Sequence, residues 1–132
     1  MLAHVSGLDG AGHTYGLRHS EIERKLLDTE KIMQTIIEKM DSNTTLLVWG
    51  DHGMTIDGNH GGSELLEMRT TLFAYQKTPF PMYEHYDKGA LRKYFRNIDK
   101  TVKHLDLAPI LSMLLDVPFP FSSLGFMHPI FA

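Results

Sequence analysis

The sequence predicts an α/β fold, a partial sandwich like that of alkaline phosphatase, with a mostly parallel sheet and helices on its faces. Short apolar runs that suit buried strands occur at residues 1–8, 45–49 and 70–75. Apolar residues at helical spacing, with charged residues between them, fill residues 19–40. Because strands that alternate with helices usually form parallel sheets, we expect a parallel sheet here.

The first half of the chain is expected to alternate between strand and helix. The strand at 1–8 leads into a tight glycine-containing loop, and the helix follows at 19–40. Ser20 with Glu23 resembles a capping box at the start of this helix. A polar turn at 41–43 then leads to the strand at 45–49.

The second half is expected to be less regular. The last helix should begin near Asp106, whose side chain suits an N-cap, should carry Pro109 in its first turn, and should end near Leu115. The other expected elements are a glycine-rich loop at 50–63, a helical turn at 64–69, a surface insertion at 77–90 with Pro79 and Pro81, and a short helix at 88–98.

Composition narrows the function classes. The chain has 132 residues, 42% of them hydrophobic, and a net charge of -3 with no basic stripe, which argues against a nucleic-acid partner. No apolar run approaches the roughly 18 residues of a membrane-spanning helix. Cysteine is absent, so any zinc must be held by histidine and carboxylate side chains.

The most informative motif is the apolar run of residues 46–49 that ends in Gly50-Asp51-His52-Gly53. In α/β sheets, ligands collect just beyond the carboxyl ends of strands. Glycines on both sides let the chain bend so that Asp51 and His52 reach one cation. The alternative is a turn aspartate with an incidental histidine.

Two further pieces extend this motif. Asp9 and His13 lie four residues apart in a glycine-rich segment, and His60 lies between pairs of turn-forming residues. Each piece alone is explained by a turn aspartate or a solvated loop histidine. Together they supply oxygen and nitrogen ligands for more than one metal ion.

The three pieces resemble a known family pattern. Asp9-x-x-Gly12-His13, Gly50-Asp51-His52-Gly53-Met54 and Gly58-x-His60-Gly61 are similar to motifs of the alkaline phosphatase superfamily. The longer stretches 8–16, 50–55, 59–64 and 71–75 resemble the glycosylphosphatidylinositol (GPI) ethanolamine-phosphate transferases. The doubled glycine after His60 and the segment 105–125 most resemble the type that acts on the third mannose of the anchor.

The resemblance implies a two-zinc mechanism. It implies that Asp9, His13 and His60 hold one zinc ion and that Asp51 and His52 contribute to the other. Two such ions can stabilise the attacking and departing oxygens of an in-line phosphoryl transfer. A threonine would take phosphoethanolamine from phosphatidylethanolamine and pass it to a mannose of the GPI anchor precursor. The family places that threonine upstream of Met1, so no residue of this chain is predicted as the nucleophile.

The resemblance also implies a cellular setting. Residues 1–132 are expected to be the carboxyl-terminal portion of a lumenal alkaline-phosphatase-like catalytic domain, inactive by itself, whose amino-terminal part and membrane spans lie outside this sequence. The complete protein is expected in the endoplasmic reticulum membrane, with a membrane-protein stabilising subunit as a possible partner. Two alternatives are a metal-dependent phosphodiesterase or pyrophosphatase of the same superfamily and a noncatalytic metal-binding remnant. Asp57 and Glu64 could orient a ligand histidine, although solvated loop roles are the simpler interpretation.

Overall fold

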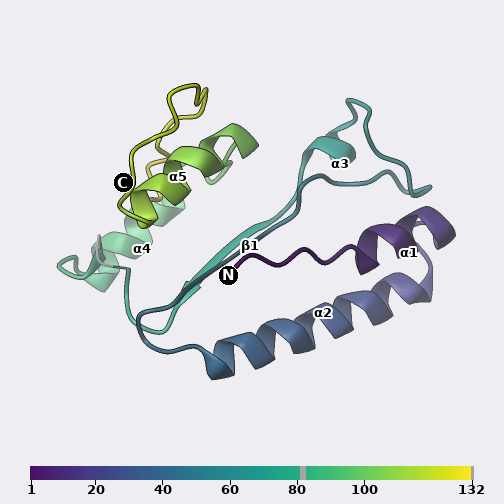
Figure 1. The fold of residues 1–132 in the computed structure, drawn as a ribbon, viewed down its shortest axis with the longest axis horizontal. Coiled ribbons are helices and arrows are strands. Elements are labelled where there is room, and N and C mark those ends of the chain that lie inside the picture. Colours follow the sequence, from purple (N-terminus) through teal and green to yellow (C-terminus); the bar gives the residue numbers. More distant parts are fainter. Residues whose placement is uncertain (81–82, 132) are drawn as a thin grey trace. The chain divides into compact units, whose positions relative to one another are not determined.

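The structure is a computed structural model that describes residues 1–80 and 83–131 (Figure 1). The chain forms two compact units, Met1–Lys77 and Thr78–Ala132, and each is considered by itself. Within the described residues, no helix is both long enough and apolar enough to cross a bilayer.

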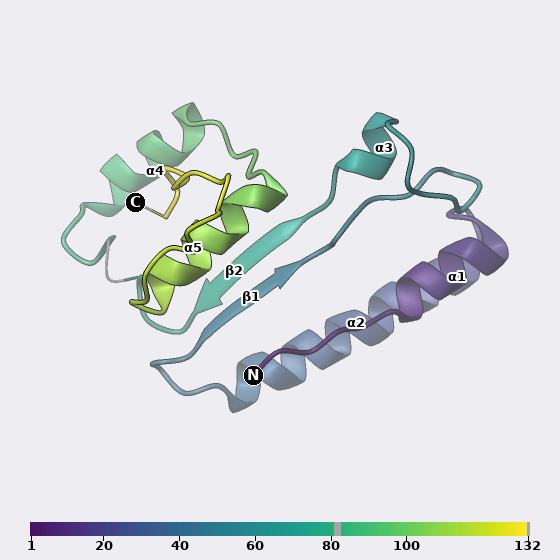
Figure 2. The same cartoon turned by 45° about the horizontal axis from the view of Figure 1, so that its top comes forward.

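The first unit combines helices with one strand pair. In both ribbon views, the chain turns after α1, and the first part of α2 runs back beside α1 (Figures 1 and 2). The elements in chain order are α1 (Gly7–Tyr15), α2 (Ser20–Lys39), β1 (Thr45–Trp49), α3 (Leu65–Met68) and β2 (Leu72–Gln76).

Helix α2 confirms the helix predicted from periodicity, but its start differs from the prediction. The N-cap is His19, whose Nδ1 accepts a hydrogen bond from the Glu21 backbone N–H at 3.2 Å, and the predicted capping box of Ser20 and Glu23 is wrong. On the exposed face, Arg24 pairs with Glu21 and with Asp28. The hydrogen bond from Arg24 holds the pKa of the Glu21 carboxyl below its ordinary value.

The described strands form an antiparallel pair, so the expected parallel arrangement does not hold for β1 and β2. Thr45 lies opposite Gln76 and Trp49 opposite Leu72. A parallel pair needs a crossover that carries the chain back to the starting edge. The connecting residues 50–71 contain only the four-residue helix α3 and turn the chain back, which places β2 antiparallel to β1.

The predicted strand at residues 1–8 is wrong. Residues 1–6 have no regular structure, and α1 begins at Gly7 in the segment that was expected to be a loop. Asp9 in the first turn interacts favourably with the amino-terminal end of the helix dipole. Gly12 lowers the helix propensity of this segment. Its lack of a side chain lets α1 approach Met54, since a Cβ on Gly12 would lie 2.2 Å from Met54 Sδ.

The second unit contains α4 (Lys88–Asn97), the 3₁₀ turn η2 (His104–Asp106) and α5 (Leu107–Leu114). Helices α4 and α5 confirm two predicted helices, and Ile110 of α5 is 1% exposed. The Tyr83 hydroxyl donates to the Ile130 carbonyl, and burial raises the pKa of this phenol. Pro81 of the expected insertion lies outside the described residues.

Asp106 occupies the residue before α5, as predicted, but its carboxylate does not cap that helix. Its Oδ2 accepts from the Lys103 backbone N–H at 3.2 Å, and its Oδ1 accepts from the Phe126 backbone N–H at 2.9 Å. These bonds join the carboxyl-terminal segment to η2. Asp106 is 6% exposed, so both bonds are shielded from water.

Candidate metal centre

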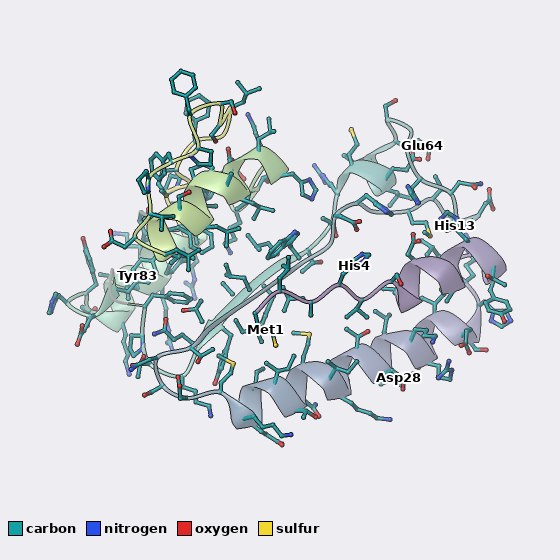
Figure 3. All side chains as sticks on the ribbon, in the orientation of Figure 1. Met1, His4, His13, Asp28, Glu64 and Tyr83 are labelled. Carbon is teal, nitrogen blue, oxygen red and sulfur yellow. The ribbon has the colours of Figure 1, made fainter. Side chains whose placement is uncertain are left out.

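Helix α1 supplies the first two side chains of the candidate site. Asp9 and His13 are one helical turn apart, so both project from the same face. The distance from Asp9 Oδ1 to His13 Nε2 is 3.6 Å. Figure 3 labels His13 near the end of α1 and Glu64 in the neighbouring connection between the strands. A helical turn, rather than the expected loop, therefore brings the Asp9 and His13 side chains together.

The connection between β1 and β2 supplies two more histidines. The Nε2 atoms of His52 and His60 lie 4.0 and 3.5 Å from Asp9 Oδ1. The two imidazoles stack with ring centroids 3.7 Å apart. His52 Nδ1 is 2.8 Å from the Gly53 carbonyl oxygen, which can only accept, so in the neutral ring the Nδ1–H donates to this carbonyl and the Nε2 lone pair is left on the side of Asp9.

These groups converge on a point that suits a cation. Asp9 Oδ1 is buried and has no hydrogen-bond partner among the described residues, although the side chain as a whole is 40% exposed. His13 Nε2 and His60 Nε2 are 3.1 Å apart. Two nitrogen ligands of one tetrahedral zinc ion lie roughly 3.3 Å apart when each bond is about 2.0 Å. A carboxylate oxygen and imidazole nitrogens are zinc ligands, so the donor set fits that metal.

The structure brings together Asp9, His13 and His60, which the resemblance assigns to one ion, and it places His52 beside them. Ligand atoms of Asp9, His52 and His60 lie within 4.8 Å of one another, whereas the resemblance separates His52 from the other two. Asp51 is outside this group and its side chain is 75% exposed. Asp51 Oδ1 accepts from the His52 backbone N–H at 3.1 Å and lies 3.8 Å from His52 Nε2.

Sequence reasoning missed Glu67, which holds the segment after His60. Glu67 is 8% exposed, and its two carboxylate oxygens accept from the backbone N–H groups of Gly62 and Glu64, each at 3.0 Å. The spacing of Glu64 and Glu67 at the start of α3 is the sequence signal that could have identified this interaction. Glu64 and Asp57 were the two acids considered for orienting a ligand histidine. The backbone N–H of Glu64 donates to Glu67, and Asp57 lines the surface beside His13.

Two glycines let α1 and the His60 segment approach each other. Gly58 has φ +86°, and a Cβ on it would lie 2.0 Å from the Gly12 carbonyl oxygen. The Leu17 backbone N–H donates to the Ile56 carbonyl at 2.9 Å and joins the same two segments. Backbone contact therefore sets the distance between His13 and His60.

The hydroxyls of Thr14 and Thr55 are already engaged. Thr14 Oγ1 donates to the Gly10 carbonyl at 2.8 Å within α1. Thr55 Oγ1 donates to the Asn59 carbonyl at 3.1 Å and accepts from the Asn59 N–H at 3.0 Å. Both threonines serve local structure, and neither was predicted as the nucleophile.

The donor set defines a candidate metal centre of the kind that serves phosphoryl chemistry. Residues 1–106 match the family model described as type I phosphodiesterase / nucleotide pyrophosphatase. The chain belongs to this family, which lies within the alkaline-phosphatase-like superfamily of generally metal-dependent enzymes. No solved structure matches the chain.

Curated relatives narrow the likeness. The chain is 37% identical over 129 residues to GPI ethanolamine phosphate transferase 3 of Eremothecium gossypii, a match that covers 95% of this chain and 12% of that protein. It is 35% identical over 132 residues to the Saccharomyces cerevisiae protein of the same name, with 95% and 12% coverage. The catalytic subunit of the Homo sapiens transferase 3 is 34% identical over 126 residues, with 95% and 11% coverage. These relatives confirm the predicted resemblance to GPI ethanolamine-phosphate transferases, and the chain spans about an eighth of their length.

Proposed function

We propose that this chain forms the metal-binding part of an enzyme that transfers phosphoethanolamine from phosphatidylethanolamine to a mannose, the third, of a GPI anchor precursor. The observation that carries the proposal is the buried, unpartnered Asp9 Oδ1, which the Nε2 atoms of three histidines surround within the described part of the chain. The named relatives support the reaction class.

The proposed metal is zinc, with two ions in the complete domain. Asp9, His13 and His60, whose ligand atoms lie 3.1 to 3.6 Å apart, would hold one ion. The family resemblance is what supports the second ion, to which Asp51 and His52 would contribute. Zinc bound there supplies a Lewis acid that polarises phosphoryl oxygens. In the reaction, the bond from phosphorus to the diacylglycerol oxygen breaks, a bond from phosphorus to the mannose oxygen forms, and the mannose proton passes to diacylglycerol.

The chain's own residues preorganise this centre. The Gly53 carbonyl fixes the tautomer of His52 so that Nε2 faces the cluster. Glu67 holds the backbone that follows His60. Each interaction leaves a ligand atom in place before a metal arrives, which lowers the cost of binding.

The setting proposed for the complete protein follows from the family resemblance. We propose the endoplasmic reticulum membrane, with the catalytic domain on the lumenal side and a membrane-protein subunit that stabilises it. Residues 1–132 would be the carboxyl-terminal portion of that domain, with the nucleophilic threonine in the preceding part.

Zinc binding by the 132-residue chain is the first test. Isothermal titration calorimetry should give one zinc ion per chain, because this chain supplies only Asp51 and His52 to the second ion. His60→Ala removes a ligand nitrogen and Asp9→Asn replaces the carboxylate with a neutral amide, so each should weaken binding by about 100-fold or more. The matched control is His85→Ala, an exposed histidine of the second unit, which should bind zinc as the wild type does. No zinc binding by the wild-type chain would contradict the proposed centre, and equal affinity for all variants would contradict the ligand set.

A chimera tests the reaction. Residues 1–132 would replace the matching segment of the Saccharomyces cerevisiae relative, and membranes would be given radiolabelled phosphatidylethanolamine. Transfer of label to a GPI precursor, lost in His60→Ala, supports the transferase. Release of free phosphoethanolamine alone would favour the phosphodiesterase alternative, which the family description raises. Zinc binding without either activity would favour the noncatalytic alternative.

A further inference from the structure

A surface depression lies beside the metal centre, within the first unit. It has a volume of about 490 Å³ and shares His13 with the centre. The other residues that line it are Thr14, Tyr15, Gly16, Arg18, Ile56 and Asp57. None of these residues other than His13 is a proposed metal ligand.

Backbone contacts hold the two walls of the depression together. One wall is the end of α1 and the turn after it, and the other is the segment at 56–57. The Leu17 N–H donates to the Ile56 carbonyl at 2.9 Å. A Cβ on Gly16, whose φ is +72°, would lie 3.1 Å from that same carbonyl oxygen. The depression is therefore a feature of the fold and not a chance arrangement of side chains.

The charges that line the depression are uncompensated. Within the described part of the chain, neither the Arg18 guanidinium nor the Asp57 carboxylate has a hydrogen-bond or ion-pair partner. One free cation and one free anion in the same depression suit a ligand that carries both signs of charge.

The anionic side of the depression suits an ammonium group. The last turn of α1 leaves carbonyl oxygens without helical partners, and the carboxyl end of a helix favours a positive charge. Tyr15 stacks on His19 with ring centroids 4.6 Å apart and stays 52% exposed, so the ring is held while a face remains open. An aromatic face also attracts cations. The carbonyl oxygens at the end of α1, the Tyr15 ring and the Asp57 carboxylate would together surround an ammonium group.

We propose that this depression binds the aminoethyl-phosphate head group of the donor, with Asp57 and the Tyr15 ring at its ammonium and Arg18 at its phosphate. The inference rests on the proposed function, which places the phosphorus at the metal centre that His13 shares. Asp57 and Tyr15 would then select ethanolamine over uncharged head groups, and Arg18 would strengthen binding of any phosphate ester.

The test compares soluble head-group esters on the zinc-loaded 132-residue chain. Glycerophosphoethanolamine should bind about tenfold more tightly than glycerophosphoglycerol, which lacks the ammonium, with shifts of the Tyr15 ring resonances in an NMR titration. Asp57→Asn should remove this preference. Arg18→Gln should weaken both esters equally, and Arg18→Lys should restore part of the loss. O-phosphoethanolamine against ethyl phosphate, run in parallel, shows whether the same preference holds for a monoester.

Matched controls lie on the exposed face of α2. Glu38→Gln and Lys31→Gln remove the same charges away from the depression and should change neither affinity. A preference that survives Asp57→Asn, or a wild type with no preference, would overturn the subsite and leave the metal centre standing. If the wild-type chain binds no zinc but glycerophosphoethanolamine still shifts the Tyr15 ring resonances, the subsite is supported and the metal centre is overturned.

Discussion

Individual glycines decide how closely the pieces of the metal centre approach. Gly58 has a positive φ and lies against the Gly12 carbonyl, so an added methyl group meets both strain and a clash. Gly10 lies in the interior of α1, and a methyl group added there would have nothing within 4 Å, so it meets neither. The two positions form a matched pair.

We expect Gly58→Ala to lower the free energy of unfolding by about 1–3 kcal/mol, because alanine rarely adopts this φ and its Cβ would overlap the Gly12 carbonyl. Gly10→Ala should raise stability by about 0.5–1 kcal/mol through helix propensity. Urea unfolding followed by circular dichroism measures both. Equal effects of the two changes would mean that the close approach of α1 does not depend on Gly58.

At the scale of elements, buried carboxylates join segments that have little regular structure. Asp106 links η2 to the chain at Phe126, and Glu67 links α3 to the chain at Gly62. Neither interaction follows from helical or strand periodicity, since each bond joins a side chain to a backbone group outside its own helix, 20 residues away for Asp106 and five for Glu67.

Asp106→Ala should lower the free energy of unfolding by about 1–3 kcal/mol, because it leaves the N–H groups of Lys103 and Phe126 without an acceptor. Asp106→Asn keeps one oxygen and should lose less. Urea unfolding of the two variants gives the comparison. If alanine and asparagine cost the same small amount, water would be satisfying both donors and the link would not stabilise the unit.

The turn between α2 and β1 predicts a dependence on pH. Hydrogen bonds from the Thr44 hydroxyl and the Asn43 backbone N–H hold the pKa of the Asp41 carboxyl below its ordinary value. A lowered folded-state pKa means that the carboxylate stabilises the fold above its unfolded pKa, and that this contribution is lost as the pH falls through the folded one.

Asp41→Asn should therefore reduce the fall in melting temperature between about pH 5 and pH 2. Thr44→Val removes one of the two donors and should reduce that fall by less. Thermal unfolding across this range is the measurement. A pH profile unchanged in both variants would show that these hydrogen bonds persist in the unfolded chain or contribute nothing.

At the scale of the whole molecule, the metal centre joins α1 to the connection between β1 and β2. These segments are far apart in sequence, with His13 and His60 47 residues from each other. A ligand that binds only the folded arrangement stabilises it by mass action. Metal binding should thus report on folding of the first unit as a whole.

Zinc at about 100 times its dissociation constant should stabilise the wild-type chain by about 2.7 kcal/mol, which a chelator should reverse. Asp9→Asn should show no such gain, because it replaces the carboxylate at the centre of the cluster with a neutral amide. Melting curves with zinc and with chelator measure the difference. Stabilisation of the variant to the same extent would place the zinc elsewhere.

Local sequence determined the parts of this protein that local physics controls. The sequence predicted α2 from its apolar spacing and β1 from its apolar run. It also showed the separate motifs that carry the candidate ligands and the family resemblance that the relatives confirm. Periodicity is a property of neighbouring residues, so long helices and short buried strands leave a clear pattern.

Only the tertiary structure decided the conformation of segments with a weak preference for helix or strand, and which candidate ligands lie close together. Residues 7–15 form a helix in which the bare Gly12 packs against Met54, and β2 returns antiparallel to β1 through a connection that contains only the short helix α3. The same contacts bring His52 beside Asp9 and leave Asp51 exposed. Such outcomes depend on backbone contacts between distant segments, which leave no period in the sequence.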